Sequence, residues 1–411
     1  MSFSARQRVF RAFVRARWLA LRLRTRPALL AHQERQMGQW RQHVIESFPH
    51  HDPDTLRMNK ADLMADFAAY NQERLSADDV RHGLETGYVH EDVACGISSG
   101  TSGNRGLYVI TDEERYQWLG VILAKALPEV WRTPQRVAVI LPQNSALYQA
   151  GNQSGWLRVQ FYDLRDGPEQ WAYDLTDFDP TTIVAPPKIL RWLAENADRQ
   201  RISPTRLYAA AETLEAPDRT IIEDAFGLHL GRIYMATEGL LGVSCNRGSL
   251  HLAEEFVKFD FDWVSNLLAT PIITDFSRRY QLMAGYRMND LLHLEDEPCP
   301  CGSPLQVVRE VVGRRDDVFW FDTVMVTPDI LRNAVLVAHP EIDDFRVQQR
   351  VDGTIILRLP ADLCEETRHR AMQSLQAAFQ RRSLSPSITL ETISRSDLFE
   401  RKLRRVERLR T

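Results

Sequence analysis

A stretch rich in hydroxyl groups and glycines occupies residues 98–106 of the sequence. It reads Ser98-Ser99-Gly100-Thr101-Ser102-Gly103-Asn104-Arg105-Gly106, and a strand-like run, Leu107-Tyr108-Val109-Ile110-Thr111, follows it. Glycines let backbone N–H groups converge on an anion and hydroxyls add further donors, so this composition is typical of a phosphate-binding loop. It is not a Walker A loop, because the Gly-Lys-Ser/Thr ending is absent and a strand follows instead of a helix. Taken alone, the stretch fits a flexible surface turn equally well.

A second set of residues has the chemistry of a metal site. Five residues separate Cys245 from His251, and one residue separates Cys299 from Cys301. Three thiolates and one imidazole are the ligand set of a closed, tetrahedral, structural zinc site. The alternative is that the cysteines are small buried hydrophobic residues and that His251 is an ordinary polar residue.

The composition limits the class of protein. The chain has 411 residues, 44% of them hydrophobic and 26% charged, as expected of a globular protein with more than one domain. The net charge of −4 gives no reason to expect a nucleic acid as partner. Five cysteines, an odd number, argue against a disulfide framework, and Cys95 and Cys364 are expected in the core. The sequence shows no run of about eighteen apolar residues and no signal-peptide pattern, so the cytoplasm is the expected location.

The elements that position these residues begin with a helical region, residues 1–90. The first 33 residues contain eight arginines and no acidic residue. A basic amphipathic helix can lie on an anionic membrane surface, or it can pack its apolar stripe on the protein and leave the arginines in water. We prefer the packing interpretation. The apolar residues that recur at helical spacing are Val9, Phe10, Phe13, Val14, Trp18 and Leu21.

Residues 91–313 are predicted to form an α/β core with a mostly parallel sheet, because short apolar runs alternate with helical stretches. Ligands of such sheets bind beyond the carboxyl ends of the strands, where Gln143, Pro186 and Glu212 follow the runs. The runs are Val137–Leu141, Thr182–Ala185 and Leu207–Ala211.

Residues 314–411 are predicted to form a small, mobile α+β lid domain. Its strand candidates, Phe345–Val351 and Thr354–Leu359, are joined across Asp352-Gly353, which is a strong hairpin signal. A helix from Glu365 to Arg382 follows. The predicted fold is therefore α/β, with a large N-terminal domain and a small C-terminal domain.

Five separated segments occur in the order found in the adenylate-forming (acyl-CoA synthetase) superfamily, and the sequence resembles that superfamily. Each segment alone also fits a helix start, an edge strand or a charged turn. Besides the loop at 98–106, the segments are Tyr234-Met235-Ala236-Thr237-Glu238 (similar to aromatic-x-x-Thr-Glu), Tyr286-Arg287-Met288-Asn289-Asp290 (Tyr-Arg-Thr-Gly-Asp), Gly313-Arg314-Arg315-Asp316-Asp317 (the Gly-Arg-x-Asp-Asp hinge) and Lys402-Leu403-Arg404-Arg405-Val406 (the tail with the catalytic lysine).

The phenylacetate-CoA ligase branch is the most similar part of the superfamily. The signs are the shortened chain, the segment Asn59-Lys60-Ala61-Asp62-Leu63 after a helical N-terminus, and the Cys and His residues before the hinge. The resemblance extends from residue 55 to residue 408. It departs from the superfamily pattern at Met235 and Asn289, which stand where glycines are usual, at residues 318–328, which lack a glycine, and after the phosphate loop, where no lysine follows.

The resemblance implies a nucleotide site. Thr237 would contact the α-phosphate, Glu238 would ligate Mg²⁺, Tyr234 would pack on the adenine, and Asp290 would accept hydrogen bonds from both ribose hydroxyls. The residues implied to hold the β- and γ-phosphates are Ser98, Ser99, Gly100, Thr101, Ser102 and Gly103. Ala211 and Glu212 would line the base, and Arg314 would also belong to the nucleotide site.

Lys402 is the implied catalytic residue, bridging the substrate carboxylate and the α-phosphate as negative charge develops. Only five of the 51 basic residues are lysines, and Lys402 is the only lysine after Lys258. A compact ammonium suits this task better than a planar guanidinium. The alternative is a solvated lysine in a basic segment.

The expected activity is adenylation of a carboxylic acid with Mg-ATP, followed by acyl transfer to a thiol, coenzyme A, with the lid domain rotating about Asp316. Two alternatives stay open. In one, the acceptor is a carrier-protein phosphopantetheine or an enzyme cysteine; in the other, the protein is a nucleotide-binding scaffold without catalysis. The acid itself is not identified, and relatives imply a homodimer. Candidates for the acyl pocket are Trp156, Phe161, Tyr162 and Tyr208.

Overall fold

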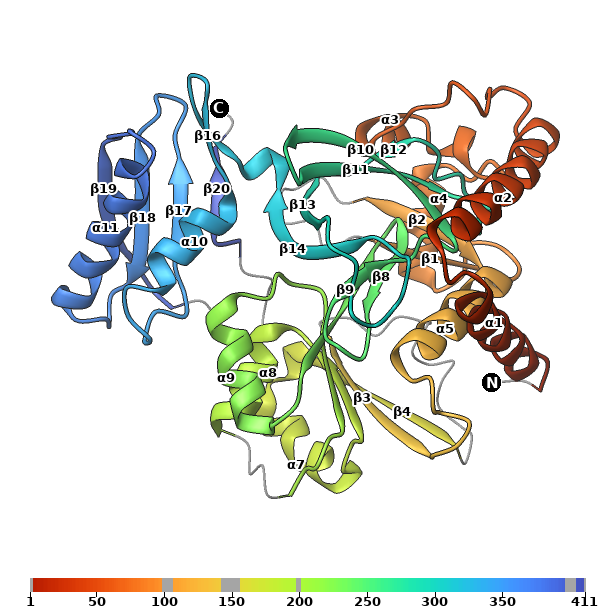
Figure 1. The fold of residues 1–411 in the computed structure, drawn as a ribbon, viewed down its shortest axis with the longest axis horizontal. Helices are drawn as coiled ribbons and strands as arrows, with labels where there is room; N and C mark the ends of the chain where they lie inside the picture. Colours follow the sequence, from red (N-terminus) through yellow and green to blue (C-terminus); the bar gives the residue numbers. More distant parts are fainter. Residues whose placement is uncertain (1–2, 98–105, 142–155, 197–200, 396–403, 410–411) are drawn as a thin grey trace.

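The structure is a computed structural model of the whole chain, and it describes residues 3–97, 106–141, 156–196, 201–395 and 404–409. The predicted phosphate-loop residues from Ser98 to Gly103, the strand-end residue Gln143 and the implied catalytic residue Lys402 lie outside the described residues. They stay predictions. The predicted fold class is confirmed: an α/β large domain is followed by a smaller C-terminal α+β domain (Figure 1).

The first part of the chain is helical, as predicted. Local capping explains where several of these helices begin: Asn59 and Asp62 form a capping box on α3, and Ser76 and Asp79 form one on α4. Gly87, with φ of 78°, ends α4 in the left-handed conformation that favours glycine. The elements are α1 (Phe3–Arg22), α2 (Arg26–Ser47), α3 (Lys60–Ala65), the 3₁₀ helix η1 (Phe67–Tyr70) and α4 (Ala77–Thr86).

Helix α1 packs against α5 (Asp112–Ala126) at the edge of the large domain (Figure 1). Val9 and Phe13 are buried in the main core, as the packing interpretation predicts. The remaining members of the predicted stripe are exposed, so only one side of the stripe faces the protein. The exposed members are Phe10, Val14, Trp18 and Leu21.

The large sheet has a parallel end, which corresponds to the predicted runs. Its strands pair in the order β4-β3-β5-β6-β7, all parallel, and helices α7, α8 and α9 belong to the same part of the chain (Figure 1). The elements are β3 (Gln135–Leu141), β4 (Leu157–Asp163), η2 (Leu164–Asp166), α7 (Pro168–Phe178), β5 (Thr182–Ala185), α8 (Pro187–Asn196), β6 (Arg206–Ala209), α9 (Ala216–Phe226) and β7 (Leu230–Ala236).

From β7 onward the same twelve-stranded sheet continues with antiparallel pairs, in the order β7-β8-β9-β14-β13-β11-β10, and β12 pairs with β11. The hairpin of β1 (Val93–Ile97) and β2 (Leu107–Thr111) forms a separate two-stranded sheet. The further elements are β8 (Gly239–Ser244), β9 (Leu250–Leu252), β10 (Val257–Ser265), β11 (Leu268–Asp275), β12 (Tyr286–Arg287), β13 (Asp290–Glu295) and β14 (Val307–Arg314).

The C-terminal domain has its own hydrophobic core and a four-stranded sheet in the order β19-β18-β17-β20. The predicted hairpin across Asp352-Gly353 is confirmed, and Gly353 has the positive φ of 83° that its turn requires. The elements are η3 (Arg315–Asp317), β15 (Phe319–Phe321), β16 (Val324–Val326), α10 (Pro328–Leu336), β17 (Arg346–Gln349), β18 (Ile355–Pro360), α11 (Glu365–Gln380), β19 (Ile388–Ile393) and β20 (Val406–Arg408).

A buried ion pair joins the two domains. Arg332, on α10 of the C-terminal domain, pairs with Glu215 of the large domain, and their side chains are only 7% and 2% exposed. Arg332 also donates to the carbonyl of Val312 on β14, over 3.0 Å. Because breaking a buried pair leaves an uncompensated charge, this contact stabilises the arrangement of the domains seen here.

Gly120 is where α1 and α5 come closest. A Cβ atom at this position would lie 2.5 Å from the Val9 carbonyl oxygen and 2.6 Å from the Ala12 Cβ. Gly120→Ala should therefore lower the free energy of unfolding by about 1–3 kcal/mol, because overpacking exceeds the gain in helix propensity. Gly38→Ala, in α2 with open space around it, is the matched control and should be neutral or slightly stabilising. Urea unfolding measures both; equal midpoints for the two variants would contradict this packing.

Candidate active site

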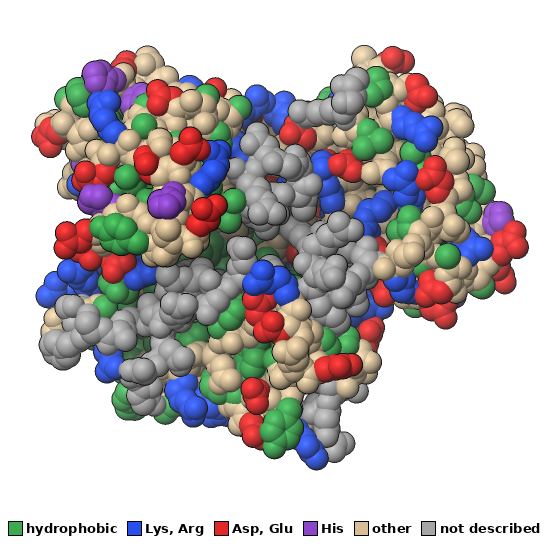
Figure 2. Space-filling view, turned by 180° about the vertical axis from the view of Figure 1, so that it is seen from behind, with side chains coloured by type: hydrophobic (Ala, Val, Ile, Leu, Met, Phe, Trp, Pro, Cys, Tyr) green, Lys and Arg blue, Asp and Glu red, His purple; other side chains and the backbone are tan. Residues whose placement is uncertain are grey.

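A cleft of about 2640 Å³ lies between the large domain and the C-terminal domain. In the space-filling view, the surface is notched between these two parts of the molecule (Figure 2). The cleft collects predicted nucleotide-site residues from segments far apart in the sequence. Those that line it are Ala211, Glu212, Tyr234, Thr237, Glu238, Asp290 and Arg314.

Thr237 and Glu238 form the two-residue tip of the hairpin between β7 and β8, in which Ala236 pairs with Gly239. The Thr237 hydroxyl donates to one oxygen of the Glu238 carboxylate over 2.9 Å, and the Tyr286 hydroxyl donates to the other over 2.8 Å. The carboxylate is therefore held in a fixed orientation at the cleft. The alternative of a helix start at Thr237 is wrong.

Arg278, whose side chain is fully buried, binds the backbone of this tip. Its guanidinium donates to the carbonyls of Thr237 and Glu238, and to that of Val109 on β2 over 2.8 Å. The sequence analysis missed this residue, because a lone arginine in an arginine-rich chain carries no distinguishing signal.

Asp275 begins the turn that presents Arg278. Its carboxylate accepts hydrogen bonds from the backbone N–H groups of Ser277 and Arg278 and from the Ser277 hydroxyl. Burial raises the pKa of the Asp275 carboxyl to about 6, although these hydrogen bonds and the charge of Arg278 act in the opposite direction. The turn is thus a polar network inside the core beneath the cleft.

Tyr234 and Asp290 meet in the cleft. The Tyr234 hydroxyl donates to Asp290 Oδ2 over 2.6 Å. Burial, together with the negative charges of Asp290 and Glu238, raises the pKa of Tyr234, so the hydroxyl stays protonated and acts as a donor. Asp290 lies at the start of β13, directly opposite Arg314 at the end of β14. An aromatic ring and a carboxylate are thereby placed at one end of the sheet, as the resemblance implies.

Ala211 and Glu212 follow β6 at the carboxyl ends of the parallel strands. Ala211 has a φ of 66°, a left-handed conformation that glycine adopts without strain. Lys188 of α8 pairs with Glu212 over 3.2 Å, and its side chain is only 5% exposed. Glu212 therefore lines the cleft as a paired carboxylate, on the side of the sheet where ligands of α/β proteins bind.

The hinge segment is held by Asn289, the residue that replaces a glycine. Its side chain both donates to Asp316 Oδ2 over 3.1 Å and accepts from the Asp316 N–H over 3.2 Å. Its backbone carbonyl accepts from the Arg315 N–H over 2.7 Å. The substitution thus adds side-chain contacts between the predicted ribose-binding segment and the hinge.

Described residues on either side of the two undescribed motifs also line the cleft. Gly96 and Ile97 precede the predicted phosphate loop, and Tyr108 follows it. Arg404, two residues after Lys402, lines the cleft as well and pairs with Asp317 over 2.5 Å. Burial raises the pKa of Asp317, while the charge of Arg404 acts in the opposite direction.

Lys60 is a second residue that the sequence analysis missed as a site residue. It is the first residue of α3 and lines the cleft near Glu238 and Arg314. Burial lowers the pKa of Lys60, and the negative charge of Glu238 opposes this effect. An ammonium group therefore lies beside the predicted magnesium ligand, although no lysine follows the phosphate loop. The sequence signal that could have identified Lys60 is its position in the segment Asn59-Lys60-Ala61-Asp62-Leu63.

The inner wall of the cleft is apolar. Of the four residues suggested for the acyl pocket, Tyr208 lines the cleft, and its hydroxyl donates to the carbonyl of Ala126 over 2.8 Å. Trp156, Phe161 and Tyr162 are not among the described residues that line it. The apolar wall comes instead from α5, β3 and β5, through Trp118, Leu119, Ile122, Leu123, Val137, Val139 and Val184.

The five cysteines are all free thiols. Cys245, His251, Cys299 and Cys301 lie together, as predicted for a metal site. The expectation that Cys364 belongs to the core is wrong: it is exposed, and its sulfur accepts the Thr367 N–H as the N-cap of α11. A cap position needs an acceptor at the helix start, which the sequence pattern alone did not reveal.

No family model matches the sequence, and no curated protein matches it. Solved structures do match the fold. A 2-hydroxyisobutyryl-CoA ligase in its postadenylation state, in complex with 2-HIB-AMP, is similar with a TM-score of 0.69 at 16% identity, over 92% of this chain and 88% of that chain. One of the fatty acyl-adenylate ligases from E. coli and L. pneumophila gives a TM-score of 0.56 at 16% identity, over 75% of this chain and 67% of that chain.

The chain therefore has the fold of adenylate-forming ligases. The same 2-hydroxyisobutyryl-CoA ligase in its thioesterification state, with 2-HIB-AMP and CoA, gives a lower TM-score of 0.52 at 16% identity, over 99% of this chain and 91% of that chain. The chain is thus less similar to that ligase in the thioesterification state than to the same ligase in the postadenylation state. Among the described residues, no helix is both long enough and apolar enough to span a membrane.

Proposed function

We propose that the protein is an AMP-forming acid–thiol ligase, which adenylates a carboxylic acid and then transfers the acyl group to coenzyme A. The observation that carries the proposal is the convergence of Tyr234, Glu238 and Asp290 in one cleft, the first two from β7 and the turn after it, the third from the start of β13. These residues come from three separate strands or turns, and the sequence predicted each of them for a part of one ATP molecule. A chance grouping of unrelated motifs would not bring them together.

The site fits a magnesium ion at Glu238. This carboxylate faces the cleft and accepts hydrogen bonds from the hydroxyls of Thr237 and Tyr286, and carboxylate oxygens are ligands that Mg²⁺ prefers. When bound, Mg²⁺ would neutralise negative charge on the phosphate oxygens of ATP. Lys60, close to the same carboxylate, adds a positive charge on this side of the cleft.

The first step joins the acid to the nucleotide. An oxygen of the substrate carboxylate attacks the α-phosphorus of ATP, the bond to pyrophosphate breaks, and acyl-AMP remains. Asp290 holds the ribose. To do so, its carboxylate gives up the hydrogen bond from the Tyr234 hydroxyl and accepts hydrogen bonds from the ribose hydroxyls instead. Lys402 lies two residues before Arg404, which lines the cleft, so the chain can bring its ammonium to the reacting phosphate.

The second step requires the C-terminal domain to move. The thiol sulfur attacks the acyl carbonyl, the bond to AMP breaks, and the thiol proton is released to solvent. The thiol needs a path to the carbonyl, so the contacts that close the cleft must open. They include the buried pair of Glu215 with Arg332, and the hydrogen bonds between Asn289 and Asp316 lie at the hinge itself.

The class of acid follows from the wall of the cleft. Aromatic and branched side chains such as Trp118, Ile122 and Val184 line its inner part. Such a wall favours an aryl acid or another organic acid with an apolar body, since each apolar group buried there contributes favourably to binding.

Exchange of pyrophosphate into ATP tests the adenylation step with a panel of aryl and fatty acids. The wild-type protein should support exchange with at least one acid. Lys402→Ala should lower the rate by about 100-fold to 1,000-fold, because a positioned cation is lost from the transition state. Asp290→Asn should raise the KM for ATP by about 10-fold, since an ionised acceptor for the ribose is lost.

The matched controls are Lys258→Ala and Asp260→Asn, which remove a lysine and an aspartate that pair with each other at the surface, outside the cleft. Both should behave as wild type. ATP binding without exchange for any acid would contradict the proposal and favour a nucleotide-binding scaffold. AMP release that depends on coenzyme A supports coenzyme A as the acceptor. AMP release that requires a carrier protein instead would make the carrier protein the acceptor.

A further inference from the structure

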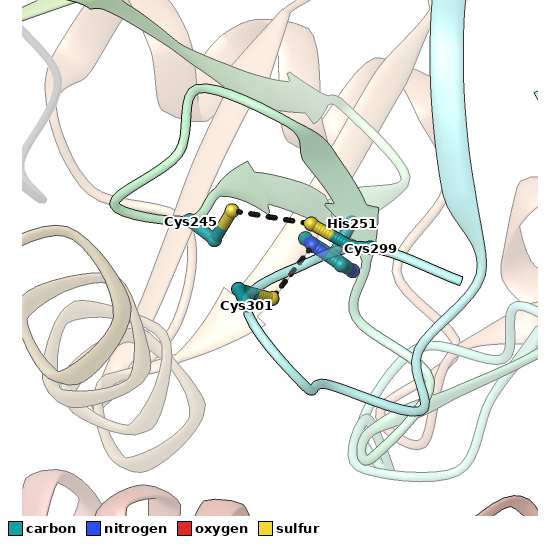
Figure 3. A group of neighbouring side chains, drawn as sticks. All are labelled: Cys245, His251, Cys299 and Cys301. Atoms are coloured by element: carbon teal, nitrogen blue, oxygen red, sulfur yellow. Dashed lines mark hydrogen bonds between the residues drawn. The ribbon is translucent and has the colours of Figure 1, made fainter. Parts of the chain in front are cut away.

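The cluster of Cys245, His251, Cys299 and Cys301 lies outside the cleft, and none of the four is among the described residues that line it. Cys245 directly follows β8 and His251 lies in β9, whereas Cys299 and Cys301 lie in the loop between β13 and β14. Two separate segments of the chain thus bring their ligand atoms together, all within 4.8 Å of one another (Figure 3).

We propose that these four side chains bind one structural Zn²⁺ ion that ties the β8–β9 hairpin to the loop before β14. Two of the distances between the ligand atoms have the values of a tetrahedral site. With usual zinc–sulfur and zinc–nitrogen bond lengths, tetrahedral geometry requires about 3.8 Å between two sulfurs and about 3.6 Å between sulfur and nitrogen. Cys245 Sγ and Cys299 Sγ are 3.8 Å apart, and Cys301 Sγ is 3.5 Å from His251 Nε2.

The surrounding backbone supports thiolate ligands. The Arg247 N–H points to Cys245 Sγ over 3.4 Å, and the Ser303 N–H points to Cys301 Sγ over 3.4 Å. Each donor lies two residues after its cysteine and next to a glycine with positive φ, Gly248 or Gly302. Backbone N–H groups directed at sulfur in this way stabilise a negatively charged sulfur.

The histidine is oriented for the same role. His251 Nδ1 lies 3.1 Å from the Leu305 carbonyl oxygen, which can only accept, so Nδ1 carries the proton and Nε2 keeps its lone pair. Nε2 faces Cys301, toward the centre of the cluster. A second partner that fixes the ring in this way is usual for histidines that bind metals. A disulfide explains the cluster less well, because the 3.8 Å between Cys245 and Cys299 far exceeds a sulfur–sulfur bond of about 2.05 Å.

The position of the ion suggests its purpose. Strand β14 pairs with β9 at only two positions, Val307 with His251 and Val308 with Leu250, before it runs on to the hinge. An ion at this point fixes β14 to the hairpin whose strand β8 pairs with β7, the strand of Tyr234. All four coordination positions come from the protein, so the ion is structural and not catalytic. This inference does not rest on the proposed function.

Elemental analysis of the purified protein, after incubation with equimolar zinc and desalting, tests the inference. Wild type should retain about one zinc per chain, as should the control Cys364→Ser, which changes an exposed cysteine far from the cluster in sequence. Cys301→Ser and His251→Ala should lose most of it. Substitution with Co²⁺ should give wild type the intense absorption bands of tetrahedral thiolate–cobalt, which a surface-bound ion lacks.

Because the ligand variants could fail to fold, the wild-type result decides by itself. Less than about a tenth of a zinc per chain, iron in place of zinc, or a cobalt spectrum without thiolate bands would overturn the inference. Retention of zinc by folded Cys301→Ser, checked by circular dichroism, would also overturn it.

A second observation concerns α1 and is independent of the cluster. Four large apolar side chains on its outer side are 47% to 62% exposed: Phe10, Val14, Trp18 and Leu21. At 100° per residue they form one stripe along the helix, next to the face that packs on α5. Arginines flank the stripe on both sides: Arg11, Arg15 and Arg22 on one side, and Arg6 and Arg17 on the other.

We infer that this stripe docks the protein on an anionic membrane surface, with α1 lying in the plane of the lipid headgroups. Arginines on both sides of an exposed apolar stripe complement lipid phosphates while the apolar side chains enter the acyl boundary. The first 33 residues carry no acidic side chain that would oppose such binding. The guanidinium of Arg22 lies 4.8 Å over the Trp18 ring, so the aromatic residue and the cation reach the same level.

Flotation with vesicles of phosphatidylcholine, alone and mixed with phosphatidylglycerol, tests this docking. The wild-type protein should float with the mixed vesicles, and less at high salt because charge attraction is screened. Phe10→Ser with Trp18→Ser should abolish flotation. The control pair, Val337→Ser with Val351→Ser, removes apolar residues of the C-terminal domain that are even more exposed, and it should leave flotation unchanged.

All four substituted positions are exposed, so their replacement leaves the core intact. Absence of flotation with mixed vesicles would overturn the inference. It would also be overturned if this surface bound an acidic protein and no vesicles. Equal flotation of the Phe10/Trp18 double variant and wild type would also overturn it.

Discussion

The buried guanidinium of Arg278 is the interaction on which the site depends. A fully buried cation is costly unless it is hydrogen-bonded, and here the two terminal nitrogens donate to the carbonyls of Thr237, Glu238 and Val109, while Nε has no partner among the described residues. These acceptors belong to the β7–β8 hairpin tip and to β2, which follows the predicted phosphate loop. The hydrogen bonds of one buried cation therefore fix the carboxylate proposed to bind magnesium relative to the strand that follows the predicted loop. Asp275 accepts a hydrogen bond from the Arg278 N–H in the turn after β11. The core beneath the cleft is therefore polar where it positions the Thr237-Glu238 tip.

The second constraint follows from the proposed function, because a two-step ligase must hold two domain arrangements with similar free energies. The buried pair of Glu215 with Arg332 stabilises the arrangement seen here. Asn289 adds hydrogen bonds to Asp316 at the hinge, where a glycine would add none. These contacts belong to one arrangement and must be replaced in the other. The proposed zinc ion would not need to be replaced when the domains rearrange. It would keep β14 rigid up to the hinge while the domain beyond the hinge moves.

Much of the site could be predicted because short motifs carry chemistry that depends on residue type. Their neighbours in the sequence predict Thr237, Glu238 and Asp290 for one nucleotide site, and the structure brings all three to one cleft. The spacing of the thiols and His251 predicts their cluster. Positions that depend on tertiary contacts could not be found in this way. Arg278 is one arginine among many, Trp118 looks like any residue of an apolar helix face, and Cys364 acts as a helix cap instead of a core residue. The spacing of apolar residues on α1 showed an amphipathic helix, but it could not show that four of the six residues of the stripe face away from the protein.

A crystal structure of the protein with Mg²⁺ and a non-hydrolysable ATP analogue tests the central claim most directly, because that claim is geometric. The account predicts one nucleotide in the cleft, with both ribose hydroxyls on Asp290, the adenine against Tyr234, and Mg²⁺ on Glu238. The Lys402 ammonium should lie at the α-phosphate in that complex. A nucleotide bound elsewhere, or one in the cleft that touches neither Asp290 nor Glu238, would contradict the account.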